Sequence, residues 1–205
     1  MPIHLASPYR DATKRETTKP DPTANRNFPG RRRNGDQLSR MKTEKPSRPI
    51  APGVSIGHVH LKVADLDRAL AFYSGVLGFE VTQRIGRDAA FLSAGGYHHH
   101  IGLNTWESRG DSPPPAGSTG LYHVAILYPT RGQLADALRR LIASHITLDG
   151  ASDHGVSEAL YLRDPDGNGV ELYWDRPRDQ WPLTADGKLA MGTRPLDLDA
   201  LLKVT

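Results

Sequence analysis

The chain has 205 residues, of which 38% are hydrophobic and 24% are charged, and it contains no cysteine. This composition is typical of one or two small globular domains. The lack of cysteine excludes disulfide scaffolds, zinc fingers and thiol nucleophiles. Charged residues and glycines interrupt every apolar stretch well before the ~20 residues that a membrane-spanning helix needs, so no membrane partner is expected. The first residues lack the apolar segment of a signal peptide, and the expected location is cytoplasmic.

The formal net charge of +3 is unevenly distributed along the chain. Residues 1–50 hold 12 Lys and Arg against 5 Asp and Glu, a net charge of +7, which leaves 14 against 18, a net charge of −4, for residues 51–205. The first segment is rich in proline and shows no helical or strand periodicity, so we expect residues 1–50 to be a disordered basic tail. No aromatic platform accompanies its Arg31–Arg33 run, so we expect no nucleic-acid partner.

The first folded unit is predicted over residues 56–106. Its opening segment HVHLKV alternates, so that apolar side chains share one face of a strand and His58 lies on the other. Apolar residues then recur at helical spacing after Asp65, a predicted N-cap, and Gly78 suits the helix end. Three short strands follow, the last of them in the segment HHHIGLNTW, which contains His100.

A second unit over residues 121–176 repeats this order of elements. It opens with LYHVAIL, which contains His123, and continues into a helix for which Thr130 and Gln133 predict a capping box. It ends in a hairpin around the turn sequence DPDGNG, which leads into Glu171. The same β-strand, helix and three-strand order therefore occurs twice.

This repeat predicts an α+β fold class with two βαβββ modules in one domain over residues 51–182. The modules are expected to form curved mixed sheets around a shared metal-binding cleft, with the helices on the outer faces. Residues 183–205 form a C-terminal extension, in which LDLDALLKV predicts a short amphipathic turn that packs on the body or on a second subunit.

Four polar side chains occupy equivalent positions in the two modules. His58 aligns with His123, and His100 aligns with Glu171, and the alternation places all four on the face opposite the helices. Any one of them alone would be interpreted as a surface or hydrogen-bonded residue. Two imidazoles and a carboxylate at repeated positions instead favour a divalent metal site, with Fe(II), Mn(II), Ni(II), Co(II) or Zn(II) as suitable ions.

The segments HVHLKVADLDRALAFYSGVLGFEV and HVAIL, with YLRDPDGNGVELYWDRP, resemble the vicinal oxygen chelate superfamily of glyoxalase I, fosfomycin-resistance proteins and extradiol dioxygenases. The resemblance covers residues 56–182 and is greatest to single-domain catechol 2,3-dioxygenase-like proteins. It implies that His58, His123 and Glu171 ligate the metal. The DPDGNGVELY hairpin recurs across the superfamily and does not by itself indicate one reaction.

The resemblance also implies three catalytic residues. His100 stands where extradiol dioxygenases keep a non-ligand histidine that handles protons and the bound oxygen species. Tyr161 lies ten residues before Glu171, the spacing of their active-site tyrosine. His154 resembles their substrate-side histidine, although the stretch before Tyr161 is two residues shorter here.

The expected function is therefore an extradiol-type dioxygenase that cleaves the ring of a catechol or related aromatic vicinal diol with dioxygen, using Fe(II), Mn(II) or another divalent ion. One alternative is a glyoxalase I-like metal-dependent lyase or isomerase, in which His100 is a fourth ligand. Another is a metal-free small-molecule-binding or resistance module, which the presence of all three ligand residues disfavours. A homodimer, and exchange of modules between its chains, stay open.

Overall fold

The computed structural model describes residues 48–205, so the predicted basic tail over residues 1–50 lies almost entirely outside the described residues. From Gly57 to Thr205 the chain belongs to one unit by its internal contacts. No helix within residues 48–205 is long and apolar enough to cross a membrane.

The first module contains the predicted strand, helix and three further strands. In chain order these are β1 (Val59–Lys62), α2 (Leu66–Leu70) with the π-helical turn η1 (Ala71–Val76), β2 (Glu80–Ile85), β3 (Ala89–Ser93) and β4 (Ile101–Asn104). They form a four-stranded sheet in the order β1-β4-β3-β2. β1 pairs with β4 in parallel, while the other pairings are antiparallel.

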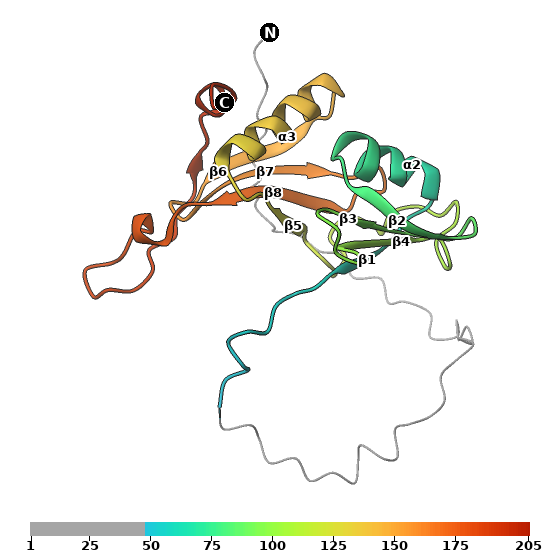
Figure 1. The fold of residues 1–205 in the computed structure, drawn as a ribbon, viewed down its shortest axis with the longest axis horizontal. Coiled ribbons are helices and arrows are strands. Elements are labelled where there is room, and N and C mark those ends of the chain that lie inside the picture. The colour runs from blue at the N-terminus through green and yellow to red at the C-terminus, as the bar shows by residue number, and fades with distance from the viewer. Residues whose placement is uncertain (1–47) are drawn as a thin grey trace, which may run out of the picture. The chain divides into compact units, whose positions relative to one another are not determined.

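The second module repeats this arrangement and adds a strand to it. Its elements are β5 (Val124–Leu127), α3 (Arg131–Ala143), β6 (Leu148–Asp153), β7 (Ser157–Arg163) and β8 (Gly169–Asp175). The sheet has the order β5-β8-β7-β6-β9, where β9 (Arg194–Pro195) comes from the C-terminal extension. In Figure 1, α2 lies over the first sheet and α3 over the second.

Strand alternation decides which side chains enter the core, as predicted. In β1, Leu61 is 5% exposed, whereas His60 and Lys62 on either side of it are exposed. In β8, Leu172 is fully buried while Glu171 is only partly covered. Each leucine side chain buried in this way contributes on the order of 2 kcal/mol to folding. The core therefore lies between the sheets and their helices, and the opposite face of each sheet carries the polar residues.

The helix ends follow the predicted capping chemistry. The Asp65 side chain accepts a hydrogen bond from the Arg68 backbone N–H at 3.0 Å. Thr130 and Gln133 form the complete capping box at the start of α3. Gly78 adopts a φ of +88°, a left-handed conformation that favours glycine after the last helical turn.

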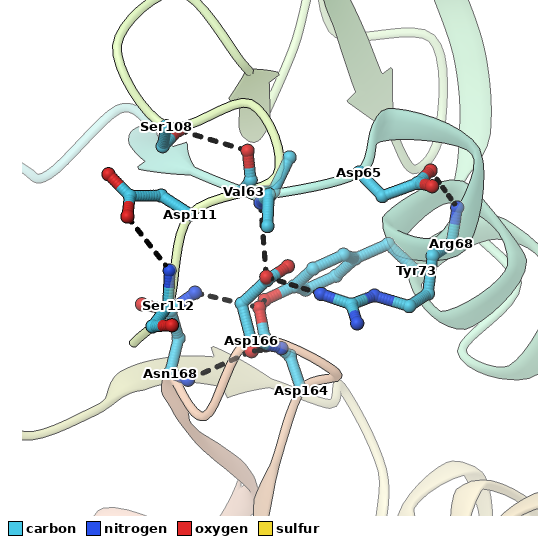
Figure 2. Close-up of polar contacts among 11 residues, drawn as sticks. Val63, Asp65, Arg68, Tyr73, Ser108, Asp111, Ser112, Asp164, Asp166 and Asn168 are labelled. Carbon is cyan, nitrogen blue, oxygen red and sulfur yellow. Dashed lines mark hydrogen bonds and ion pairs between the residues drawn. The ribbon is translucent and has the colours of Figure 1, made fainter. Parts of the chain in front are cut away.

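The turn between β7 and β8 joins the second module to the first (Figure 2). The buried Tyr73 hydroxyl donates to Asp164 Oδ2 at 2.9 Å. Asp166 Oδ1 accepts from the Ala64 backbone N–H at 3.0 Å and pairs with Arg68 Nη2 at 2.5 Å. These contacts fasten the start of the first helix to the second sheet.

The C-terminal extension packs on the body of the protein. After β8 the chain forms a 3-10 turn, η2 (Arg178–Gln180), and then β9 and the short helix α4 (Leu198–Leu202). Leu201 of α4 is fully buried, and Arg139 of α3 donates to the Leu202 carbonyl at 2.9 Å. The predicted amphipathic turn thus lies against α3.

Candidate functional site

A histidine and a glutamate contact each other on the polar face of the second sheet. His123 lies immediately before β5, and Glu171 lies in β8 opposite Ala125 of β5. His123 Nε2 is 2.8 Å from Glu171 Oε2, and the carboxylate side chain is 12% exposed. Two predicted metal ligands therefore meet through the two atoms that would bind an ion.

Glycine at position 169 allows this contact. A Cβ added at Gly169 would lie 2.0 Å from the Tyr122 carbonyl oxygen and 3.0 Å from the Cα of His123. The start of β8 therefore approaches the backbone of residues 122 and 123 more closely than any side chain permits. The close approach sets the distance between His123 and the strand that carries Glu171.

Tyr161 and His154 extend the contact series. Tyr161 lies in β7 directly opposite Glu171, and its hydroxyl is 3.1 Å from Glu171 Oε1. The same hydroxyl is 2.7 Å from His154 Nε2. Burial, and then the Glu171 carboxylate, raise the pKa of Tyr161 above its ordinary value. Tyr161 is therefore a neutral phenol at physiological pH, able to donate a hydrogen bond. His154, despite the shorter preceding stretch, directly contacts Tyr161.

The donor set of this cluster fits a divalent ion. Imidazole nitrogen and carboxylate oxygen together suit Fe(II), Mn(II) and related ions. His123 Nδ1 is buried and has no hydrogen-bond partner among the described residues. A ligating histidine normally donates from its other ring nitrogen to an acceptor. Among residues 48–205, His123 Nδ1 has no such acceptor.

A second group of histidines lies on the first sheet. The His58 and His99 rings are 4.4 Å apart between centroids, and His98 Nδ1 is 2.7 Å from His99 Nδ1. His60 packs between Phe91 and Trp106, as the alternation of β1 allows. Desolvation, followed by the neighbouring imidazoles, lowers the pKa values of His60 and His99. These rings are consequently disposed to be neutral.

His100 is oriented by the β3 end rather than by a second carboxylate. Its Nδ1 lies 3.3 Å from the Ala94 backbone N–H and 3.2 Å from Ser93 Oγ. A backbone N–H can only donate, so His100 Nδ1 is the acceptor and a neutral ring carries its hydrogen on Nε2. Tyr97 stacks on the ring at 4.9 Å. His100 therefore presents an N–H donor.

The predicted site residues thus fall into two groups. His123, Glu171, Tyr161 and His154 are together, whereas His58 and His100 lie on the other sheet. Residues 48–205 contain no group of three or more side chains placed to hold a metal ion. The physical reason is that β1 and β5 belong to different sheets. Alternation places His58 and His123 on the same face of their respective sheets, but it does not determine whether the two faces lie against each other.

Two contributors to the site carry no motif in the sequence. In the extension, the Gly192 carbonyl oxygen lies 2.9 Å and the Thr193 hydroxyl oxygen 3.3 Å from His154 Nδ1.

An open polar cavity of about 820 Å³ lies elsewhere, near the start of α2. None of the predicted site residues lines this cavity.

Comparison with known proteins identifies the family to which the chain belongs. The family model described as the glyoxalase/bleomycin resistance protein/dioxygenase superfamily matches residues 55–172. A catechol-2,3-dioxygenase of Bacillus subtilis (strain 168) is 45% identical over 149 residues, which is 72% of this chain and 51% of that protein. Biphenyl-2,3-diol 1,2-dioxygenase 3 of Rhodococcus globerulus is 33% identical over 120 residues, 58% of this chain and 63% of that protein.

The chain thus spans about half to two thirds of the length of these curated relatives. Among solved structures, a glyoxalase/dioxygenase from Nostoc punctiforme has a TM-score of 0.51 at 21% identity, covering 65% of this chain and all of that one. That likeness shows the α+β fold of paired modules. By its family-model match, its dioxygenase relatives and its fold, the chain belongs to the glyoxalase/bleomycin resistance protein/dioxygenase superfamily.

Proposed function

We propose that this chain is a metal-dependent dioxygenase of the extradiol type, which cleaves the ring of a catechol or a related aromatic vicinal diol with dioxygen. The observation that carries the proposal is the contact series of His123, Glu171, Tyr161 and His154 on one sheet face. The first two are metal-ligand types and the last two can move protons. The names of the curated relatives support the same reaction class.

In this proposal His123 and Glu171 hold the metal together with His58. Fe(II) is the expected ion, and Mn(II) or another divalent ion would suit the same donors. Such an ion, when bound, supplies neighbouring positions for the two diol oxygens and for dioxygen. Tyr161 is placed to hydrogen-bond a substrate oxygen beside Glu171, and His100 offers its Nε2 hydrogen to a developing negative charge on oxygen.

We also propose that the chain acts as a homodimer in which each metal site takes residues from both copies. His58 is exposed on the first sheet, while the His123 and Glu171 pair lies on the second. The buried Tyr73 to Asp164 hydrogen bond fastens the two modules of one chain in this arrangement. A two-fold axis would bring His58 of each copy to the pair of the other, giving two equal sites.

Exposed apolar side chains support this pairing. They lie beside both half-sites, which are His58 on the first sheet and the His123 and Glu171 pair on the second. Trp106, which packs against His60, is 59% exposed, and Leu127, which shares the β5 face of His123 by alternation, is 52% exposed. Each sheet face thus carries exposed apolar side chains next to residues that form only part of the proposed metal site. Such a surface is expected of an interface between copies.

The test of the proposed activity is reconstitution with Fe(II) under anaerobic conditions, followed by addition of catechol and air. We expect dioxygen uptake and a yellow ring-opened product. Stoichiometric iron with no oxygen consumption across a panel of catechols would contradict the proposal. Methylglyoxal with a thiol then tests the glyoxalase I-like alternative, and failure to retain any divalent ion would favour the metal-free binding module.

A further inference from the structure

His154, which contacts the Tyr161 hydroxyl through Nε2, is held by a segment of the C-terminal extension. This segment belongs to neither module. The His154 ring is bonded through Nδ1 to the Gly192 carbonyl oxygen at 2.9 Å, with Thr193 Oγ1 at 3.3 Å. The Gly192 backbone N–H in turn donates to the His154 carbonyl at 3.1 Å. Residues 192 and 193 thus contact both the backbone and the side chain of His154.

This segment is anchored on both sides of Gly192. Before it, the Ala190 N–H donates to the Pro182 carbonyl at 2.8 Å. After it, β9 (Arg194–Pro195) pairs with Ser152 and Asp153 of β6. The Gly192 carbonyl is therefore fixed relative to the sheet that carries Tyr161 and Glu171.

The Gly192 contact determines where the His154 ring carries its hydrogen. A carbonyl oxygen can only accept, so the short contact requires a hydrogen on Nδ1. A neutral imidazole has one N–H, so Nε2 is then unprotonated and must accept. Its partner at 2.7 Å is the Tyr161 hydroxyl, whose single hydrogen cannot also serve Glu171 Oε1 at 3.1 Å.

We propose that residues 192–195 are a positioning element of the active site: the Gly192 carbonyl holds neutral His154 as the Nδ1–H tautomer, so that Nε2 receives the proton of Tyr161. The role in turnover rests on the proposed dioxygenase function, whereas the tautomer itself does not. By directing the Tyr161 hydrogen to His154, the segment also leaves the Glu171 carboxylate without a competing donor from that side.

The proton transfer balances without a further reactant. A substrate hydroxyl loses its proton to the Tyr161 oxygen as the Tyr161 proton moves to His154 Nε2. One substrate O–H bond breaks and one forms on Tyr161, while the former Tyr161 O–H bond is replaced by an N–H bond on His154. The substrate becomes an anion and His154 an imidazolium ion, with no change of oxidation state.

The tautomer can be measured directly on the full chain labelled with ¹⁵N-histidine. Long-range ¹⁵N–¹H correlation spectra distinguish Nδ1–H, Nε2–H and averaged rings, and the His154 signals are those lost in His154→Gln. We expect the Nδ1–H pattern for His154. An Nε2–H pattern, or averaging of the two tautomers as in free imidazole, would overturn the proposal.

Two shortened chains test whether the segment causes this tautomer. A chain ending after Leu196 keeps the Gly192 carbonyl, and one ending after Met191 loses it, while both lack α4. We expect the Nδ1–H form only in the longer one. At similar KM, kcat for oxygen uptake should be lower in the shorter one, by up to about the 10²- to 10⁴-fold that a positioned acid or base contributes. The same tautomer in both would contradict the proposal.

Both shortened chains lose the buried Leu201 of α4. If either fails to fold, the full chain carries the test through an ester in place of the amide between residues 192 and 193, which weakens the Gly192 carbonyl as an acceptor. We expect partial loss of the Nδ1–H form, and an unchanged spectrum would overturn the causal role. The control is the same ester placed between residues 116 and 117, outside this segment, which should leave the His154 spectrum unchanged. If the Nδ1–H tautomer is fixed but the protein takes up no oxygen, the proposed dioxygenase function is wrong and the proposed tautomer still holds.

Discussion

Glu171 is the residue on which the second half-site depends, because its two oxygens contact different partners. Oε2 meets His123, and Oε1 lies near the Tyr161 hydroxyl. Glu171→Gln keeps the shape and removes the charge. We expect metal affinity to fall by at least the 10- to 100-fold that loss of a supporting partner costs a metal site. Anaerobic equilibrium dialysis against Fe(II) measures this.

The matched control is Glu107→Gln, since Glu107 is an exposed carboxylate that pairs with Lys62 at 3.8 Å. Its metal affinity should equal that of the wild type. If both variants bind the ion equally well, Glu171 is not a ligand and the metal site proposed here is wrong.

The substitution His100→Ala distinguishes a proton-handling role of His100 from a metal-ligand role. Its Nδ1 accepts from the Ala94 N–H, so only Nε2 is free to act. If it handles protons, His100→Ala should retain the full metal stoichiometry while kcat falls about 10²- to 10⁴-fold. His98→Ala, two residues earlier in the chain, is the control and should change kcat little. Loss of the metal in His100→Ala would instead assign His100 as a fourth ligand, as in a glyoxalase-like site.

At the scale of elements, the close approach of β8 to residues 122 and 123 is the most sensitive packing feature of the site. In Gly169→Ala the new Cβ would lie 2.0 Å from the Tyr122 carbonyl, so the backbone has to move. We expect a loss of about 1–3 kcal/mol in unfolding free energy, as in other overpacked positions, together with weaker metal binding.

Gly150→Ala provides the control for this variant, because a Cβ at Gly150 in β6 has no atom within 4 Å. Urea unfolding followed by metal titration compares the two. Equal stability and equal metal affinity would show that the spacing of β5 and β8 does not set the His123 to Glu171 contact.

The elements also show how far the sequence alone could lead. Alternation in HVHLKV and in GVELYWD correctly predicts that Leu61 and Leu172 enter the core, because the side-chain period of a strand is two. The capping side chains at Asp65 and Thr130 were predictable because capping depends on local residue types. Both signals are local, and they fix the face of each site residue within its own sheet.

The features that the sequence could not predict depend on contacts between distant segments. No periodicity marks β9, which has two residues, or the contact of Gly192 with His154 across 38 positions. The relation between the two sheets is also invisible to alternation, which is why His58 was expected beside His123 and lies instead in the histidine group of the first sheet.

At the scale of the whole molecule, the join between the modules should be a measurable part of the stability. The Tyr73 hydroxyl is buried and donates to the Asp164 carboxylate, so Tyr73→Phe leaves a buried charged acceptor with one donor fewer. We expect a loss of about 1.5–3 kcal/mol in unfolding free energy. In Tyr128→Phe, where the hydroxyl has no hydrogen bond among the described residues, the loss should be under about 0.5 kcal/mol. Equal losses of unfolding free energy in the two variants would show that the Tyr73 to Asp164 hydrogen bond does not hold the modules together.

The homodimer makes a prediction that no single chain can meet. His58→Ala and Glu171→Ala each remove a ligand from a different module, so each variant alone should fail to retain the metal. When the two are unfolded together and refolded, half of the dimers are mixed, and each mixed dimer has one site with every ligand intact. Metal retention should then return to about a quarter of the wild-type value per chain, given two equal sites per dimer.

The control mixture is His123→Ala with Glu171→Ala, which damages the second module in both partners. Every site in such a mixed dimer lacks one ligand, so no metal should be retained. Recovery in the first mixture but not in the second requires ligands from two copies, because mixing cannot repair a site built within one chain. No recovery in either mixture, from dimers that refold, would mean that His58 reaches His123 and Glu171 by closure of its own two sheets.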